Sequence, residues 1–339
     1  MNDRPPIPTR RLAGDAAGVA EAARLLRDGA CVAFPTETVY GLGADATDPA
    51  AVAGIFAAKT RPRLNPLIAH LPARAAAQAQ GAFDVHALRL AEAFWPGPLT
   101  LVVPASAGTT VCDLARAGLP SVALRVPGSG LARDLLGIVG RPVAGPSANR
   151  SGRVSPTRAG HVLADLDGRI AAVLDGGDTS VGIESTVIAC LGGPPRLLRP
   201  GGITRAAIGA VLGFAFDGQE LGGQELGRPK DAEAARPLGP GLLASHYAPR
   251  ARLRLDAAAI EAGEAALLFG PAEPLGLDAA RAVVNLSVGG DLAEAAARLF
   301  GALRDLDASG AAMIAVAPIP SSGLGEAILD RLARAAAPR

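Results

Sequence analysis

Apolar and polar residues follow two alternating periods along the first two thirds of the chain. A helical spacing over residues 17–29 precedes the apolar strand pattern of 30–34, after which a loop is predicted to open at Pro35. Further helices are predicted at 49–59, 85–94, 129–136, 156–166 and 204–213, and further strands at 99–105, 121–127, 141–145, 171–177 and 185–191. Some strands are separated by loops too short for a crossover, so we expect an α/β fold with a mixed sheet.

The apolar periodicity is lost in residues 214–249, where glycine, proline and charged residues accumulate. Beyond this stretch, strand patterns at 251–256, 264–270, 281–287 and 313–320 alternate with alanine-rich helices near 288–307 and 323–337. This alternation predicts a second, smaller α/β domain, Rossmann-like, with a parallel sheet. We therefore expect a first domain at 12–207, a linker at 208–249 and a C-terminal domain at 250–339.

The composition indicates a globular protein and argues against some function classes. The 339 residues are 49% hydrophobic, which is ample for a buried core. A net charge of +1 and 3% aromatic residues do not favour nucleic-acid binding. The cysteines Cys31, Cys112 and Cys190 form no CxxC pair, so reduced core thiols are expected. No apolar run is long enough for a membrane span or a signal peptide, which predicts a soluble, cytoplasmic protein.

One lysine stands out, because the chain has 31 arginines and only two lysines, Lys59 and Lys230. Lys59 follows Ile55 by four residues and so lies on the apolar face of the predicted helix 49–59. Pro62 ends that helix and places Arg61 on an extended backbone. Two interpretations remain open at this point. The cations either complement the helix dipole, with a lysine that snorkels to solvent, or they bind an anion.

A second polar cluster lies in residues 145–157, GPSANRSGRVSPT. Ser147 and Asn149 follow a predicted strand in a turn, where ligand groups are common, although turn chemistry alone explains such a pair more often. Ser155 and Pro156 are predicted as the N-cap and first residue of helix 156–166. Thr157 would then lie in the first helical turn, where amide groups favour phosphate.

The predicted strand 121–127 presents Ser121 and Arg125 on the face opposite its apolar residues. An arginine on such a strand needs an anionic partner, which is either a structural carboxylate or the carboxylate of a substrate. The sequence has no Walker A motif, no GxGxxG after a strand and no GxSxG elbow. Its four histidines also lack the spacing of metal ligands, so no metal site is expected.

Eight segments that occur in order between residues 34 and 249 together resemble the YrdC-like threonylcarbamoyl-AMP synthase family, in its long two-domain form. They are FPTETVYGLGADA, KTRPRLNPLIAH, WPGPLTLV, VALRVP, GPSANRSGRVSPT, GIESTVI, LRPGGIT and PGLLASHYAP. The resemblance implies a YrdC-like twisted mixed sheet with flanking helices. It also implies a nucleotidyltransferase that converts L-threonine, bicarbonate and ATP into L-threonylcarbamoyladenylate and pyrophosphate, for the N6-threonylcarbamoyladenosine at position 37 of tRNA.

The resemblance further implies Mg²⁺ on the ATP, a downstream tRNA threonylcarbamoyl transferase machinery, and neither membrane binding nor stable nucleic-acid binding. Catalytic roles are carried over to Lys59, Arg61, Ser147 and Asn149. ATP contacts are carried over to Arg61, Asn65, Ser121, Asn149, Thr157, Arg199 and Tyr247, and threonine contacts to Thr38, His70, Arg125, Ser147 and Ser185. Since Tyr247 lies in the linker, residues 237–249 are predicted to act as a lid over the nucleotide, and the preceding part as a tether.

The chemistry implied by the resemblance agrees with these residue types. Formation of an adenylate needs positioning and charge neutralisation more than a covalent nucleophile. Lys59 and Arg61 would neutralise the phosphates, and Arg125 would bind the carboxylate of threonine. An RNA-binding accessory protein without catalysis stays as an alternative. Carbamoyl transfer through a carbamoyl-adenylate is another, although the chain lacks the zinc-finger-like cysteines of such proteins. The role of residues 250–339 remains open between regulation, lid support and partner docking.

Overall fold

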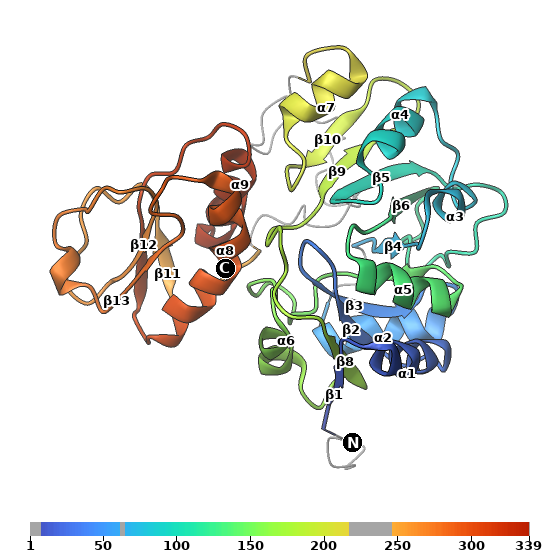
Figure 1. The fold of residues 1–339 in the computed structure, drawn as a ribbon, viewed down its shortest axis with the longest axis horizontal. Coiled ribbons are helices and arrows are strands. Elements are labelled where there is room, and N and C mark those ends of the chain that lie inside the picture. Colours follow the sequence, from blue (N-terminus) through green and yellow to red (C-terminus); the bar gives the residue numbers. More distant parts are fainter. Residues whose placement is uncertain (1–7, 62–64, 217–245, 339) are drawn as a thin grey trace.

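The structure, a computed structural model, describes residues 8–61, 65–216 and 246–338. Two α/β bodies of unequal size lie side by side (Figure 1). The described N-terminal residues lie in the larger body, whereas the C-terminus lies beside the helices of the smaller one. The two-domain α/β architecture predicted from the sequence is confirmed.

The larger body is built on one mixed sheet. Among the described residues its ten strands have the order β1-β8-β2-β3-β7-β4-β6-β5-β9-β10. The sheet contains parallel pairs such as β5 with β9 and antiparallel pairs such as β5 with β6, which confirms the prediction of a mixed sheet. The strands are β1 (Arg10–Ala13), β2 (Val32–Pro35), β3 (Tyr40–Asp45), β4 (Ile68–His70), β5 (Leu99–Pro104), β6 (Ser121–Arg125), β7 (Val143–Ala144), β8 (Ala172–Asp175), β9 (Thr186–Ala189) and β10 (Arg196–Arg199).

Helices cover this sheet and bury its apolar side chains. Asp48 caps the N-terminus of α2 and Pro49 is its first residue, so the helix begins where a side-chain acceptor and a fixed φ favour it. It ends at Lys59, as predicted, and Thr60 follows with a left-handed φ of 54°. The helices are α1 (Ala16–Arg27), α2 (Pro49–Lys59), α3 (Arg74–Gln78), α4 (Val85–Phe94), α5 (Gly130–Val139), α6 (Ala159–Leu166) and α7 (Arg205–Leu212).

Two sequence predictions in this body are wrong. The loop expected after Pro35 is only a short turn, because Tyr40–Asp45 forms β3 and pairs antiparallel with β2. The helix expected at 156–166 begins at Ala159, after Arg158, so Ser155 is not its N-cap and Thr157 precedes its first turn. The hydroxyl of Ser155 instead donates to the buried carboxylate of Glu184, which gives that residue a tertiary role in place of a capping role.

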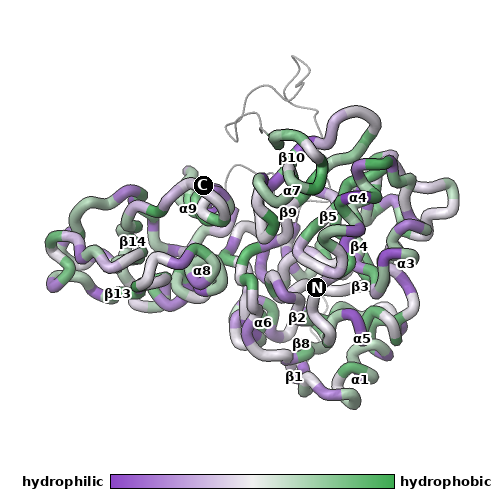
Figure 2. The backbone as a smooth tube through the Cα atoms, turned by 45° about the horizontal axis from the view of Figure 1, so that its top comes forward, coloured by the Kyte–Doolittle hydropathy of each residue, from purple (hydrophilic) through white to green (hydrophobic). Residues whose placement is uncertain are grey.

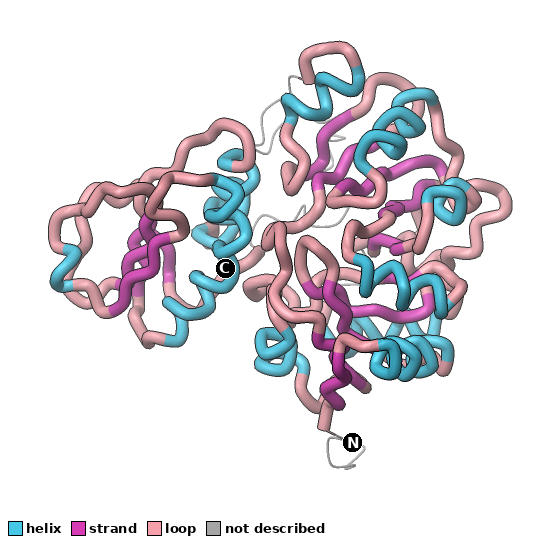
Figure 3. Tube along the Cα trace, viewed as in Figure 1, coloured by secondary structure: helices cyan, strands magenta, loops and turns pink. Residues whose placement is uncertain are grey.

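The smaller body contains a parallel sheet, as predicted. Its described strands have the order β11-β14-β12-β13, and each neighbouring pair is parallel. The strands are β11 (Arg252–Arg254), β12 (Ala265–Leu268), β13 (Ala282–Asn285) and β14 (Met313–Val316), with the short helix η1 (Leu277–Ala279) and the helices α8 (Leu292–Ala308) and α9 (Gly325–Ala336). Figure 3 shows α8 and α9 on the side of these strands that faces the larger body.

The helices α8 and α9 form the contact between the two bodies, and Figure 2 shows α8 next to α6 from a second direction. Arg304 of α8 donates to Asp165 of α6 at 2.8 Å, and Arg205 of α7 pairs with Glu326 of α9 at 2.7 Å. At Gly182 the backbones come so close that a Cβ would lie 2.4 Å from the Cα of Ala297 in α8. The bodies are therefore docked through specific contacts.

The segment predicted as a linker, 208–249, lies only partly within the described residues. Residues 208–212 belong to α7, and 246–249 are described, whereas 217–245 lie outside the described part of the chain. No helix among the described residues is long and apolar enough to cross a bilayer.

Candidate active site

A narrow cavity lies where several strand ends of the larger body meet residues 246 and 247. Its volume is about 50 Å³, which holds only a few water molecules, whereas ligand sites usually measure about 300–1,000 Å³. The surrounding residues are therefore packed closely around the cavity, and we call this the closed arrangement. The lining residues are Thr38, Val39, Arg61, Ile68, His70, Arg125, Gly145, Pro146, Ser147, Glu184, Ser185, Arg199, His246 and Tyr247.

Lys59 joins the end of α2 to the turn that carries Ser147 and Asn149. Its side chain is 1% exposed, and its Nζ atom donates to the backbone carbonyl groups of Ser147 and Asn149. In return, the N–H of Ser151 donates to the carbonyl of Lys59 at 3.0 Å. Burial, and to a smaller extent the nearby Arg61, lowers the pKa of Lys59 well below its ordinary value. The lysine thus fixes the backbone of the turn from inside the protein.

Arg61 and Arg199 bring two guanidinium groups to the cavity. The Nε and Nη2 atoms of Arg61 are buried and have no hydrogen-bond partner among the described residues. Burial lowers the pKa of Arg61 to about 10, so the group stays charged at neutral pH. Arg199 donates through Nη2 to the carbonyl of Ser185 at 2.9 Å and to its hydroxyl at 3.2 Å. Buried cationic donors without partners make this a place for an anion.

Arg125 reaches the cavity from the end of β6, and its partner is a carboxylate of the protein. Its Nη2 donates to Glu37 at 2.6 Å, its Nη1 to the hydroxyl of Thr38 at 2.9 Å, and its Nε to the carbonyl of Gly97 at 3.3 Å. The sequence left the partner open between a structural and a substrate carboxylate. In the closed arrangement the structural one, Glu37, fills that role. These bonds use three of the five N–H donors of the guanidinium.

His70 lies at the end of β4 with its ring against Gly145. A Cβ at Gly145 would lie 2.9 Å from the Nδ1 atom of His70, so glycine is needed for this close approach. Burial, and then Arg125, lowers the pKa of His70 to about 3, which leaves the imidazole neutral at physiological pH. Its Nδ1 is buried and lacks a partner among the described residues. A neutral imidazole with an unbonded ring nitrogen can donate a hydrogen bond to a ligand, or accept one from it, without adding charge to the site.

Glu184 is the buried carboxylate of the cavity wall. One oxygen accepts from the hydroxyl of Ser155 at 2.5 Å, and the other accepts from Nε of Arg331 at 2.9 Å. Burial alone would raise the pKa of Glu184, but Arg331 and then Arg199 hold it below its ordinary value. The carboxylate is therefore ionised and fully engaged by its neighbours.

His246 and Tyr247 close the cavity from the C-terminal side. Their rings meet edge to face with centroids 4.0 Å apart, and Tyr247 is 1% exposed. The hydroxyl of Tyr247 and the Nδ1 of His246 are buried and have no hydrogen-bond partner among the described residues. Of the lid predicted at 237–249, residues 237–245 lie outside the described part, and the described end forms one wall of the site.

Five of the residues carried over from the resemblance are buried but do not line the cavity. Asn149 donates to the carbonyl groups of Arg150 and Arg153, and Thr157 donates its N–H to His161 at 3.3 Å. The full set is Lys59, Asn65, Ser121, Asn149 and Thr157, whereas Thr38, Arg61, His70, Arg125, Ser147, Ser185, Arg199 and Tyr247 do line it.

Three charged residues of this region were not predicted from the sequence: Glu37, Glu184 and Arg331. Glu184 could have been noticed, because it is the only carboxylate in the segment GIESTVI, whereas Glu37 shares the segment FPTETVYGLGADA with Asp45 and is not singled out by it. Arg331 carries no such signal. It lies in an amphipathic helix of the smaller body, and only the tertiary structure brings it to Glu184.

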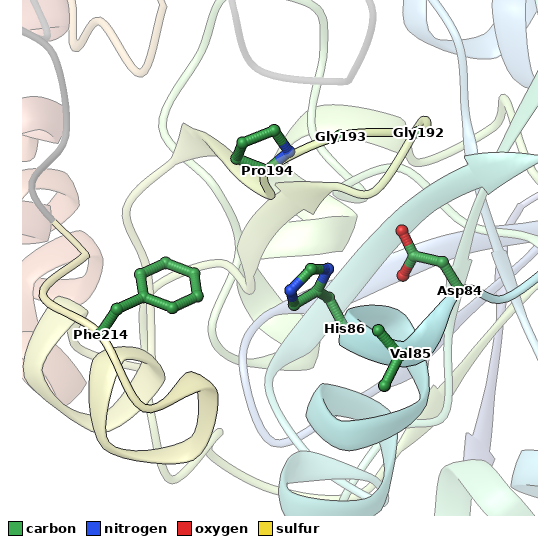
Figure 4. A pocket seen from close by; sticks show the side chains of 7 residues that line it. All are labelled: Asp84, Val85, His86, Gly192, Gly193, Pro194 and Phe214. Carbon is green, nitrogen blue, oxygen red and sulfur yellow. The ribbon is translucent and has the colours of Figure 1, made fainter.

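A larger cavity, of about 720 Å³, lies elsewhere on the larger body. Figure 4 shows the side chains that line it, among them His86 and Phe214, whose ring centroids are 6.3 Å apart. Its lining is Asp84, Val85, His86, Gly192, Gly193, Pro194 and Phe214. This surface offers no arginine or lysine and none of the residues carried over from the resemblance. The narrow cavity is therefore the candidate active site.

Comparisons with known proteins agree with this fold. The Sua5–YciO–YrdC family model, described as "Telomere recombination", matches residues 24–201, and the model described as "Threonylcarbamoyl-AMP synthase, C-terminal domain" matches residues 203–337. A protein of Bacillus subtilis named threonylcarbamoyl-AMP synthase is 40% identical over 95% of this chain and 93% of its own length. A protein of that name from Pyrococcus abyssi is 39% identical over 93% of this chain and 92% of its own length.

The same fold occurs in a solved structure. The crystal structure of Pyrococcus abyssi Sua5 in complex with L-threonine superposes with a TM-score of 0.83 and 35% sequence identity, over 97% of each chain.

Proposed function

This chain belongs to the Sua5–YciO–YrdC family, and we propose that it converts ATP, L-threonine and bicarbonate into L-threonylcarbamoyladenylate and pyrophosphate. The names of its full-length relatives support an enzyme that makes an adenylate, and the threonine complex of the Pyrococcus abyssi protein supports the amino-acid substrate. The reactive product must be consumed by an enzyme that transfers the threonylcarbamoyl group to tRNA, so we expect such a transferase as a partner in the cytoplasm.

One observation carries this proposal: Arg61 presents to the cavity, which Arg199 also lines, two buried guanidinium nitrogens that have no hydrogen-bond partner among the described residues. Glu184 is shared between Arg199 and Arg331, and Arg61 forms no ion pair with a carboxylate among the described residues, so the cavity keeps an excess of positive charge that favours a polyanion such as a triphosphate. The described lining of the pocket contains no glycine-rich loop, so fixed guanidinium groups would take the role of the backbone amides of a P-loop. We therefore assign the phosphates of ATP to Arg61 and Arg199.

The chemistry needs two bond-forming steps. The amine of threonine attacks the carbon of CO₂ released from bicarbonate, which forms the N–C bond of a carbamate and frees one proton. An oxygen of the carbamate then attacks the α-phosphorus of ATP, and the bond from this phosphorus to the pyrophosphate oxygen breaks. Negative charge moves onto pyrophosphate in this step, and fixed cations such as Arg61 stabilise it.

The threonine would lie beside the phosphates, among Thr38, His70, Ser185 and Arg125, which line the same cavity. His70 is neutral and has a free ring nitrogen, which suits the hydroxyl of the amino acid. The carboxylate would use the N–H donors of Arg125 that Glu37, Thr38 and Gly97 leave free, or would displace Glu37. In either case the ion pair with Glu37 orients the guanidinium before substrate binds.

Mg²⁺ fits this site as an ion carried by ATP. The carboxylate in the cavity wall, Glu184, is engaged at both oxygens by Ser155 and Arg331, and no cluster of three ligating side chains occurs among the described residues. Magnesium commonly keeps several waters and binds through substrate phosphates, so the triphosphate would supply most of its ligands. When bound, the ion would neutralise part of the phosphate charge beside Arg61.

The test is pyrophosphate release by the purified full chain with each reactant omitted in turn. The proposal predicts release only when ATP, L-threonine and bicarbonate are all present, and serine or valine should not replace threonine. Release that is indifferent to threonine would contradict it. Tight, strongly salt-dependent tRNA binding without ATP turnover would instead favour an RNA-binding accessory protein.

A further inference from the structure

Arg331 of α9 is the largest fully buried side chain among the described residues. A buried guanidinium is unfavourable unless its donors are paired. Its Nε donates to Glu184 at 2.9 Å, its Nη1 to Asp330 at 2.6 Å, and its Nη2 to the carbonyl of Pro200 at 2.9 Å. Glu184 and Pro200 belong to the larger body. The arginine therefore crosses the interface and ends in the wall of the candidate active site.

The same guanidinium contacts the ring of Tyr247. Its central carbon lies 5.3 Å from the ring centroid, within the range of a cation–π interaction. A second neighbour of this ring is Phe300 of α8, with centroids 5.5 Å apart and an interplanar angle of 27°. Both contacts come from the smaller body. The hydroxyl of Tyr247, in contrast, is buried and has no hydrogen-bond partner in the described part of the chain, and the residue lines the cavity of the larger body.

The backbone of Tyr247 also needs support from its surroundings. Its φ is 63°, a left-handed conformation that is unfavourable for an aromatic residue and persists only where neighbours hold it. The N–H of the next residue, Ala248, donates to the carbonyl of Gly152 at 2.9 Å, so the larger body contributes one of these contacts. The smaller body contributes the ring contacts with Arg331 and Phe300, and the carbonyl of Arg334 accepts from the N–H of His246 at 3.2 Å.

We propose that Arg331 is a positioning residue of the active site, contributed by the C-terminal body, which fixes Tyr247 and Glu184 relative to Arg61 and Arg199. The inference rests on the proposed function and extends it. It gives the C-terminal body a direct part in the reaction, because a shift of α9 moves the wall against which the nucleotide binds.

Arg304 provides a matched control. Like Arg331, it extends from a helix of the smaller body to a carboxylate of the larger one, where it donates to Asp165 and to the carbonyl of Val154. It does not contact Tyr247 or Glu184 in any hydrogen bond or ring interaction of the described structure. A general loosening of the interface should therefore appear in Arg304→Met as well, whereas the loss of positioning should appear only in Arg331→Met.

The experiment is a double-mutant cycle on the full chain. The value of kcat/KM for ATP is measured by pyrophosphate release for the wild type, Arg331→Met, Tyr247→Ala and the double variant, with Arg304→Met in both backgrounds. Contacting residues commonly couple by about 0.5–3 kcal/mol, or roughly 2- to 150-fold. We expect Arg331→Met to lower kcat/KM about tenfold or more in the wild-type background and by a clearly smaller factor in the Tyr247→Ala background, where only the support of Glu184 is left to lose.

Equal losses from Arg331→Met in both backgrounds would overturn the inference, and so would an equal loss from Arg304→Met. Melting temperatures identify variants that do not fold. If Arg331→Met is one of these, the cycle uses Arg331→Lys, which keeps a cation opposite Glu184 but loses the planar fork. If the wild type itself releases no pyrophosphate, the proposed function fails. The cycle is then measured on the dissociation constant of ATP by calorimetry, where the same coupling is expected.

Discussion

Substitution of Lys59 by methionine isolates the part of the site that the sequence marked most clearly. Methionine fills nearly the same volume as the lysine stem but cannot donate to the carbonyl groups of Ser147 and Asn149. A hydrogen bond that involves a charged group contributes about 1.5–3 kcal/mol, so the two bonds together contribute roughly 3–6 kcal/mol before offsets. Burying the ammonium group costs the folded protein several kcal/mol of desolvation free energy, and the methionine variant no longer has this cost. The net loss of unfolding free energy should therefore be only about 1–3 kcal/mol.

The effect on catalysis should be larger than the effect on stability. Without the lysine, two buried carbonyl groups have lost their donor and the Ser147 turn can shift. A misplacement of about 1 Å in a reactive site can cost about 100-fold in rate, which corresponds to about 2.7 kcal/mol. We expect Lys59→Met to lower kcat/KM for pyrophosphate release by at least about 100-fold while the protein stays folded.

Two further variants show whether the turn is the cause. Arg169→Met removes a 3.3 Å bond to the carbonyl of Ala58 at the same helix end but leaves the turn alone, so its activity should stay within about twofold of wild type. Lys59→Arg keeps a cation, yet its planar fork does not suit two carbonyl groups around one point charge, so it should not restore activity. Near wild-type kcat/KM in Lys59→Met, or an equal loss in Arg169→Met, would refute this reasoning.

Two predictions concern stability. Folded His70, with its pKa near 3, binds fewer protons between pH 6.5 and 3 than the unfolded chain does, so acidification through this window favours unfolding. His70→Gln should reduce the slope of unfolding free energy against pH by up to about 1.4 kcal/mol per unit in urea titrations, and an unchanged slope would contradict the buried neutral imidazole. Gly182→Ala should lower the melting temperature more than Gly177→Ala, because both have a left-handed φ but only Gly182 lies against the backbone of α8. Equal losses would show that the close approach to α8 does not matter.

Local chemistry explains which parts of the fold could be predicted. Helix α2 has its predicted limits because Asp48, Pro49 and the following Pro62 act within a few residues of the helix ends. Strand β3 was missed because its glycines indicate a loop, whereas Gly43 is needed for tertiary packing. A Cβ at this position would lie 3.0 Å from the ring of Phe34.

The functional site, like the fold, has parts that could be predicted from the sequence and parts that could not. The sequence placed Lys59 on a buried helical face and associated it with the Ser147 turn, and the structure brings them into contact. It could not identify the carboxylate opposite Arg125, because Glu37 reaches that guanidinium only through the order of strands in the sheet. Arg331 was still harder to predict from the sequence, because its partner Glu184 lies 147 residues away in the other body. Charged partners that meet across a domain interface leave no local pattern.

The central claim is that the buried guanidinium of Arg61 binds the phosphates of ATP next to an amino acid. A crystal structure of the full chain with a non-hydrolysable ATP analogue, Mg²⁺ and L-threonine tests it most directly. We predict phosphate oxygens within hydrogen-bond distance of Nε and Nη2 of Arg61, and the threonine between His70 and Arg125. Phosphates bound away from Arg61, for example in the cavity beside Phe214, would contradict it.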